Sequence, residues 1–108
     1  MRVDLLQGTL DMLILKALSG SAKHGYGVAR WLEEATSDAL RVEEGSLYPA
    51  LHRLAERGWV EAEWGYSENN RKARFYRLTV AGRRRLRVEK VAWGRFVAVV
   101  SKVMSSPA

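Results

Sequence analysis

The residues between Val42 and Val60 combine an apolar stripe with a polar and basic face. Leu47, Leu51 and Leu54 recur at the i, i+4, i+7 spacing of a helix, so they predict a helix with one side in a core. The residues off this stripe mix hydrogen-bonding, aromatic and cationic groups: Ser46, Tyr48, Pro49, His52 and Arg53. Such a face suits the major groove of DNA, although a solvated surface helix has a similar composition.

A second group of candidate residues follows in a polar loop expected at 65–72. Arg71, Lys72 and Arg74 lie in or beside this loop, and Asn69 and Asn70 lie at its tip. Flexible cations beside a groove-binding helix can reach phosphates or a narrow minor groove. A solvated run of charge is the alternative interpretation, and the position beside the helix favours DNA.

His24 and Tyr26 stand where another helix is expected to begin. The exposed N–H groups at a helix N-terminus attract phosphate, and a histidine there can also cap the helix without binding any ligand. His24 and His52 are the only histidines and there is no cysteine, so no ligand spacing indicates a metal site. No glycine-rich phosphate loop, nucleophile elbow or inward carboxylate pair is present, so the sequence predicts neither an enzyme nor a cofactor.

These candidate residues need a particular order of helices and strands to position them. The patterns predict elements at 4–19 (helix), 21–25 (turn), 25–36 (helix), 40–42 (very short strand), a helix ending at Gly58, 59–64 and 73–79 (strands) and about 80–104 (helix). In the second helix Tyr26, Ala29 and Leu32 are expected to face inward. Three helices followed by a two-stranded ribbon indicate a mainly α fold with a small β-hairpin (α+β), the winged helix-turn-helix arrangement.

The composition and charge indicate the class of partner. The 108 residues are 47% hydrophobic and 28% charged, as in one globular domain with or without an appended element. The net charge of +6 is uneven, since residues 1–64 carry −3 and residues 65–108 carry +9, which suggests a polyanion partner. The lack of cysteine, of a signal peptide and of any run near the ~20 apolar residues of a membrane span predicts a cytoplasmic protein without membrane contact.

Four motifs resemble the PadR family of bacterial transcriptional regulators, in particular its short class with a single C-terminal helix. They are Gln7-Gly8-Thr9-Leu10-Asp11, His24-Gly25-Tyr26-Gly27, Gly45-Ser46-Leu47-Tyr48-Pro49-Ala50-Leu51 and Tyr76-Arg77-Leu78-Thr79. The resemblance covers about residues 5–82, and the third motif is the most specific. It implies a homodimer that binds a pseudo-palindromic operator and usually represses. It also implies a C-terminal helix that dimerises and, in several members, helps to form a small-molecule pocket.

The last predicted helix carries a wide apolar stripe. Leu86, Trp93 and Val100 recur at seven-residue spacing, and Phe96, Val97, Val103 and Met104 lie on the same or an adjacent face. Such a stripe on a terminal helix must be covered, and a second copy of the chain would cover it, so these seven residues are the predicted dimer interface. The resemblance places Trp93 where family members stack flat aromatic ligands, and a ligand-free tryptophan of the dimer core is the alternative.

These observations lead to one expected function and two alternatives. Residues 1–80 are expected to form the DNA-binding domain and residues 81–108 the dimerisation helix. The expected protein is a homodimeric repressor that binds double-stranded operator DNA and is released by a small aromatic effector. The first alternative is a protein-interaction winged helix that docks on an acidic partner without sequence-specific DNA binding. The second is a constitutive DNA binder without any ligand.

Overall fold

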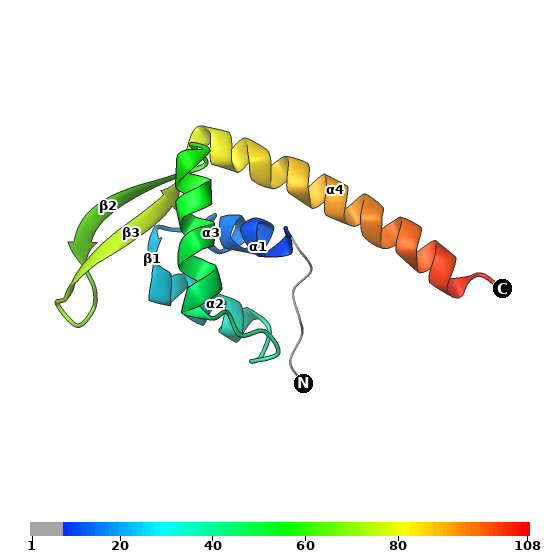
Figure 1. Cartoon of the computed structure of the whole chain (residues 1–108), viewed down its shortest axis with the longest axis horizontal. Helices are drawn as coiled ribbons and strands as arrows, with labels where there is room; N and C mark the ends of the chain where they lie inside the picture. Colours follow the sequence, from blue (N-terminus) through cyan, green and yellow to red (C-terminus); the bar gives the residue numbers. More distant parts are fainter. Residues whose placement is uncertain (1–7) are drawn as a thin grey trace.

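Residues 8–108 are described in this computed structural model as four helices and a three-stranded antiparallel sheet (Figure 1). The elements are α1 (Thr9–Ala17), β1 (Lys23–His24), α2 (Gly25–Ala35), α3 (Glu44–Glu56), β2 (Val60–Tyr66), β3 (Lys72–Leu78) and α4 (Val80–Ser105). The strands lie in the order β1-β3-β2. This α+β arrangement confirms the predicted fold class.

The core forms where α1, α2 and α3 cross and the base of the sheet closes the remaining side. Leu47, Leu51 and Leu54 are fully buried, as their spacing predicted, and Ala50 joins them. The same cluster receives side chains from the other elements: Ile14, Leu15, Leu18, Val28, Leu32, Val60, Tyr76 and Leu78. The leucine stripe therefore positions α3 and leaves its other sides open.

Three predicted features between residues 21 and 42 are wrong in the structure. The expected turn at 21–25 contains β1, which pairs with β3 through the Lys23–Tyr76 and His24–Phe75 registers. Residues 40–42 form no strand, and Leu40 instead buries its side chain in the core. Tyr26 does not face inward, because α2 buries the face of Gly25, Val28 and Leu32 and leaves Tyr26 64% exposed.

The start of α1 and the place of Pro49 in α3 complete the description of the helices. Among the described residues α1 begins at Thr9, and the predicted helical residues 4–7 lie outside the described part. Pro49 is the sixth residue of α3 and follows its first turn. Its ring nitrogen therefore lacks the hydrogen bond that a helix would make to the carbonyl of Gly45. Both residues are exposed, so water can reach that carbonyl.

The start of α4 is joined tightly to the rest of the domain. The Thr79 hydroxyl accepts a hydrogen bond from the Gly82 N–H at 3.0 Å and donates one to the Gly58 carbonyl at 2.6 Å, so it caps α4. Leu86 is only 7% exposed and lies in the core cluster. This corrects its assignment to the dimer interface, because the first turns of α4 pack against α1 within one chain.

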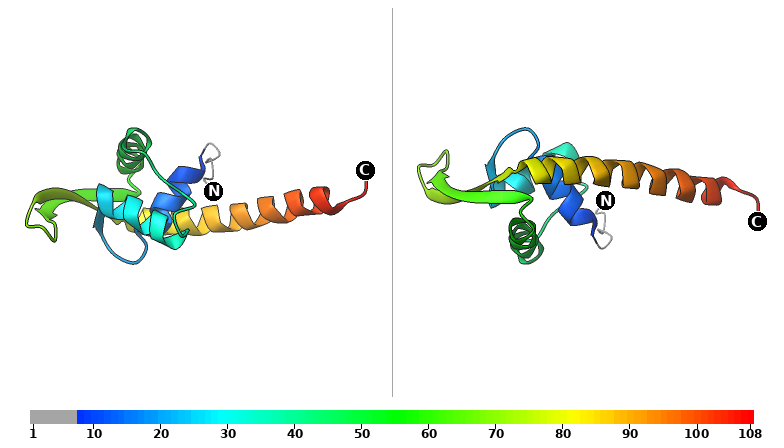
Figure 2. Two further views of the ribbon diagram at one scale, coloured as in Figure 1. Left: turned by 90° about the horizontal axis from the view of Figure 1, so that it is seen from below. Right: turned by 90° about the horizontal axis from the view of Figure 1, so that it is seen from above.

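Beyond Leu86 the helix leaves the domain. In the views from below and above, the C-terminal half of α4 projects away from α2, α3 and the sheet (Figure 2). The described residues measure 57 Å along their longest axis and 22 Å along their shortest. None of the helices within residues 8–108 is both long and apolar enough to cross a membrane.

Candidate nucleic-acid interface

Helix α3 presents its polar side chains to solvent. Ser46, Tyr48, Pro49, His52 and Arg53 are all exposed. At 100° per residue, Tyr48 and Arg53 point about 140° apart around the helix axis, with Pro49 and His52 between them. The helix therefore has an outer face and two flanks: the Tyr48 flank lies against Gly25 of α2, and the Arg53 flank lies against Asp11 of α1.

Tyr48 rests against the first residue of α2. A Cβ on Gly25 would lie 2.7 Å from the Tyr48 hydroxyl oxygen, so the missing side chain of Gly25 allows the ring to pack there. Burial raises the pKa of Tyr48, and the nearby charges of Glu44 and Tyr76 raise it further. The hydroxyl therefore keeps its proton and remains a hydrogen-bond donor at the edge of the interface.

His24 is the N-cap of α2. Its Nδ1 accepts a hydrogen bond from the Gly27 N–H at 2.9 Å, so the proton of the neutral ring lies on Nε2. The ring packs edge-on against Phe75 at 5.3 Å and beside Tyr26 at 6.2 Å. The structure thus gives His24 the capping role that was the alternative to phosphate binding. Nε2–H and the first N–H groups of α2 remain the donors at this end of the helix.

The β2–β3 hairpin forms a wing that extends past the core (Figure 1). Its loop closes through hydrogen bonds between Ser67 and Arg71, with the Ser67 N–H donating to the Arg71 carbonyl at 2.8 Å. Asn70 adopts a left-handed conformation (φ 56°) that suits an asparagine at a hairpin tip. Arg71, Lys72 and Arg74 are all exposed, as expected for cations that reach outward.

Trp64 is a candidate residue that the sequence pattern concealed. Alternation placed it on the inner face of β2 with Val60 and Ala62, yet it is 63% exposed. The inner face continues beyond the edge of the core, so Trp64 has no core beneath it. It pairs with Arg74 across the sheet, and the ammonium of Lys72 lies 5.1 Å from its ring centre. The exposure of Trp64 could have been predicted only by comparing the length of the hairpin with the extent of the core.

The wing, the start of α2 and Tyr48 enclose an open groove of about 840 Å³. Its lining contains the cations Arg30, Arg71, Lys72 and Arg74 and the acids Glu34 and Glu68. Aromatic rings of His24, Tyr26, Tyr48 and Trp64 form much of the remaining wall. The Arg30 guanidinium bonds Glu34 at 3.1 Å and the Tyr26 hydroxyl at 3.4 Å, so the excess cations come from the wing.

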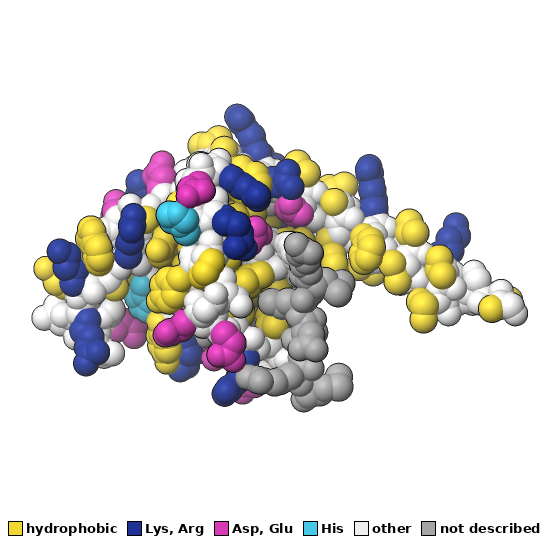
Figure 3. Space-filling view, viewed as in Figure 1, with side chains coloured by type: hydrophobic (Ala, Val, Ile, Leu, Met, Phe, Trp, Pro, Cys, Tyr) yellow, Lys and Arg dark blue, Asp and Glu magenta, His cyan; other side chains and the backbone are white. Residues whose placement is uncertain are grey.

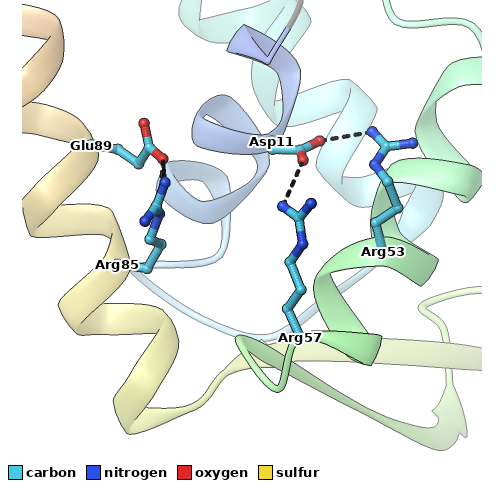
Figure 4. A network of polar contacts seen from close by, with 5 residues as sticks. All are labelled: Asp11, Arg53, Arg57, Arg85 and Glu89. Carbon is cyan, nitrogen blue, oxygen red and sulfur yellow. Dashed lines mark hydrogen bonds and ion pairs between the residues drawn. The ribbon is translucent and has the colours of Figure 1, made fainter.

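Two of the predicted DNA-contacting residues of α3 have partners within the chain. His52 Nε2 lies 2.8 Å from the Glu56 carboxylate one turn later. An Arg53 nitrogen lies 2.9 Å from Oδ1 of Asp11 in α1, and an Arg57 nitrogen lies 4.0 Å from Oδ2 of the same carboxylate (Figure 4). The structure therefore ties the α1-facing flank of α3 to α1, which the sequence pattern did not reveal.

The far half of α4 exposes the remaining residues of the predicted dimer interface. They are Trp93, Phe96, Val97, Val100, Val103 and Met104. Yellow apolar side chains follow the helix to its end in Figure 3. The Trp93 and Phe96 rings lie 5.9 Å apart, and Trp93 is 42% exposed. By helical spacing this face continues the one that buries Gly82 and Leu86.

A metal site finds no support in the described residues. Among residues 8–108, His, Asp and Glu side chains form no group of three that could hold an ion. The acids near α3 pair with arginine or histidine instead. The interface is therefore built from hydrogen-bond donors, aromatic rings and cations, a set that suits phosphates and base edges.

Three helices with an exposed third helix and an adjacent hairpin define a winged-helix, DNA-binding class of protein. The chain matches the profile of the Transcriptional regulator PadR-like family over residues 14–88, and it belongs to this family. It is thus a DNA-binding transcriptional regulator, and the prediction that it is not an enzyme is confirmed by the family.

Solved structures agree with this assignment. A transcriptional regulator from Clostridium thermocellum superposes with a TM-score of 0.83 at 25% identity over 93% of this chain and 97% of the other. A PadR-like regulator from Bacillus cereus gives 0.80 at 27% identity over 94% and 97%. A PadR family regulator from Eggerthella lenta gives 0.80 at 29% identity over 94% and 86%. An uncharacterised protein of Lysinibacillus sphaericus is 25% identical over 95% of this chain and 94% of its own length.

Proposed function

We propose that this chain is a homodimeric repressor that binds a pseudo-palindromic operator, with one copy of α3 in the major groove of each half-site. The observation that carries the proposal is a groove, formed by the wing, the start of α2 and Tyr48, that borders the outer face of α3. The outer face of α3 is open, the capped start of α2 lies beside it, and the wing adds cations. A helix flanked by phosphate-binding elements is the arrangement that base reading in a major groove requires.

The outer face of α3 reads the bases in this proposal. Pro49 and His52 project from it, and Ser46 stands at its edge beside Arg53; the hydroxyl and the imidazole can exchange hydrogen bonds with base edges. His52 would leave Glu56 to do so, at little cost because both side chains are well exposed. From the flank next to α2, the Tyr48 hydroxyl donates a hydrogen bond to a phosphate.

The wing and the start of α2 hold the DNA backbone. Arg71, Lys72 and Arg74 supply salt-dependent contacts, and Asn70 presents the tip of the wing. His24 and Tyr26 place the N-terminus of α2 against a phosphate. Trp64 lies among these cations, and its indole N–H adds a further donor to the same surface.

Helix α4 forms the dimer in this proposal. Residues 1–80 act as the DNA-binding domain and residues 81–108 as the dimerisation helix, with Leu86 given to the core. A continuous exposed apolar face of this length is costly in water, and a second copy of the same face covers it. The dimer then presents two copies of α3 about 34–36 Å apart, one turn of DNA.

An effector site at Trp93 is the regulatory part of the proposal. The partly exposed Trp93 ring next to Phe96 offers a surface on which a flat aromatic molecule stacks. A ligand that alters the angle between two copies of α4 would change the spacing of the two α3 helices and weaken operator binding. Titration of Trp93 fluorescence with aromatic compounds tests this, using Trp93→Phe to subtract the signals of the other tryptophans.

The experiment that tests the whole proposal is selection of genomic fragments by the purified protein at physiological salt, followed by sequencing. Recovery of an inverted repeat supports it. Binding without a motif that disappears as salt rises would instead favour the protein-partner alternative. The sign of regulation follows from transcription in vitro with the recovered fragment, where a repressor lowers the yield of transcript.

The wing provides a residue-level test on the same fragment. Replacing Arg71 and Lys72 by alanine is expected to reduce the slope of log K against log salt by about 0.9 for each phosphate that the wing no longer neutralises. Arg84→Ala is the matched control, because Arg84 is an exposed cation on α4 away from the groove. Equal slopes for the wing variant and the wild-type protein would contradict the proposed role of the wing.

A further inference from the structure

The ion pairs around Asp11 connect the reading helix to α1 in an unequal way. Arg53 is bound closely, at 2.9 Å from Oδ1, while Arg57 lies further away, at 4.0 Å from Oδ2 (Figure 4). The Asp11 side chain is only 19% exposed, whereas both arginine side chains are about half exposed. One mostly covered carboxylate thus has two cationic neighbours, of which it holds one.

Arg53 lies where the proposed DNA complex needs a cation. A helix in the major groove has a sugar-phosphate strand along each side. The wing and α2 serve the Tyr48 flank, and Arg53 is on the opposite flank, about 140° away around the axis. Among the described residues of α3 and its C-cap, Arg53 and Arg57 are the cations on that side. In this structure the Arg53 guanidinium is directed to Asp11.

On the basis of the proposed function, we propose that Asp11 stores Arg53 until DNA binds. Arg53 then transfers to a phosphate of the operator, and Arg57 moves onto Asp11 in its place. Asp11 acts as an internal substitute for phosphate, and Arg57 is a positioning residue that never touches DNA. Arg53 thus supplies the phosphate contact on the flank of α3 opposite Tyr48, and it does so only when a phosphate is present.

The surroundings of Arg57 allow this exchange without leaving a charge alone. If Arg53 left by itself, the mostly covered Asp11 carboxylate would lose its close partner, which is costly in such a setting. Arg57 prevents this by moving toward Oδ2. It gives up a position 5.2 Å from the Trp59 ring, and Arg85 stays on that ring at 4.9 Å.

Arg85 needs no new partner in this step, since it is already paired with Glu89 (Figure 4). Its Nε donates to the Glu89 carboxylate at 2.8 Å. Trp59 therefore keeps one guanidinium on its ring before and after the exchange. The network replaces one close and one distant ion pair at Asp11 with a single close pair, and the operator phosphate gains the pair with Arg53.

The test measures the salt dependence of binding to the selected operator. Arg53→Ala is expected to lower the slope by about 0.9, the value for one neutralised phosphate. Arg57→Ala should lower it by the same amount, because Arg53 then has no substitute at Asp11 and stays there. The slope of the double variant should fall no further than that of either single one. Circular dichroism and thermal unfolding confirm that each variant is folded.

Removing the carboxylate that holds Arg53 provides the decisive variant. In the Asp11→Asn protein no carboxylate holds Arg53, so Arg53 can reach the phosphate without help from Arg57. The Asp11→Asn/Arg57→Ala double variant should therefore show the wild-type slope, unlike Arg57→Ala alone. The exchange is overturned if Arg57→Ala alone keeps the full slope, or if the effects of the two arginine substitutions add. Arg84→Ala again controls for the removal of one charge. Failure of the wild-type protein to select any operator would refute the proposed function itself, which is a separate result.

Discussion

Replacing Gly82 by alanine is expected to destabilise this protein strongly, although alanine is normally the better helix former. A Cβ at this position would lie 1.9 Å from the carbonyl oxygen of Trp59 and 2.9 Å from its carbon. Real Cβ contacts essentially never fall below 3.0 Å, so α4 and the start of the wing would have to separate by about 1 Å. The obstacle is backbone, which cannot rotate aside as a side chain can.

The magnitude follows from the hydrogen bonds that this separation would break. The Thr79 N–H donates to the Trp59 carbonyl at 3.1 Å, and the Thr79 hydroxyl donates to Gly58 at 2.6 Å. Breaking or lengthening two such bonds costs about 1 kcal/mol each, and overpacking costs about 1–3 kcal/mol. The higher helix propensity of alanine offsets at most about 1 kcal/mol of this destabilisation. The net destabilisation is roughly 2–4 kcal/mol, or on the order of 10–25 °C in Tm for a domain of this size.

The assay is thermal and urea unfolding at one fixed protein concentration, because the stability of the proposed dimer would depend on concentration. Gly94→Ala is the matched control, since Gly94 lies in the same helix and nothing stands within 4 Å of its missing Cβ. It should stabilise the protein by up to about 1 kcal/mol. A Gly82→Ala protein as stable as the Gly94→Ala protein would refute the close approach of α4 to Trp59.

Three further outcomes are expected. Thr79→Ala should lower the free energy of unfolding by about 1–2 kcal/mol and Thr79→Ser by much less, because the serine hydroxyl still caps α4; equal decreases in urea titrations would contradict the cap. His24→Ala should cost about 1 kcal/mol and His24→Asn less, since asparagine keeps a capping acceptor, and the same urea titrations check it. The raised pKa of Tyr48, caused by burial first and then by Glu44 and Tyr76, delays its ionisation in the folded chain. Above about pH 10 the unfolded chain loses this proton first, so wild-type stability should fall relative to Tyr48→Phe, and a constant difference across that range would count against the burial of the hydroxyl.

Much of the fold was predictable because its signals are local. The i, i+4, i+7 spacing of Leu47, Leu51 and Leu54 predicts a buried stripe, and all three are buried. The threonine before Val80 predicts a capped helix, and its hydroxyl makes the cap. Such features depend on helical geometry over a few residues and hardly on the rest of the chain.

The errors arise where a residue's environment depends on a distant segment. Residues 23–24 become a strand because β3, which comes much later in the chain, passes beside them. Trp64 follows the alternation of an inward residue but extends past the core, so it is exposed. Leu86 belongs to the apolar stripe of α4, yet α1 covers it within the same chain. Periodicity gives the direction of a side chain, whereas burial depends on what lies in that direction.

The amino-acid sequence was enough to indicate the class of this protein, namely a winged-helix regulator with an open third helix, a basic wing and an apolar last helix. How the candidate residues are engaged became apparent only in the folded chain. Folding made His24 a helix cap, set Tyr48 against Gly25, and tied Arg53 to Asp11 across 42 residues of sequence. Helical and strand periods are short-range properties of the chain. Ion pairs and close backbone approaches exist only once packing brings separate elements together.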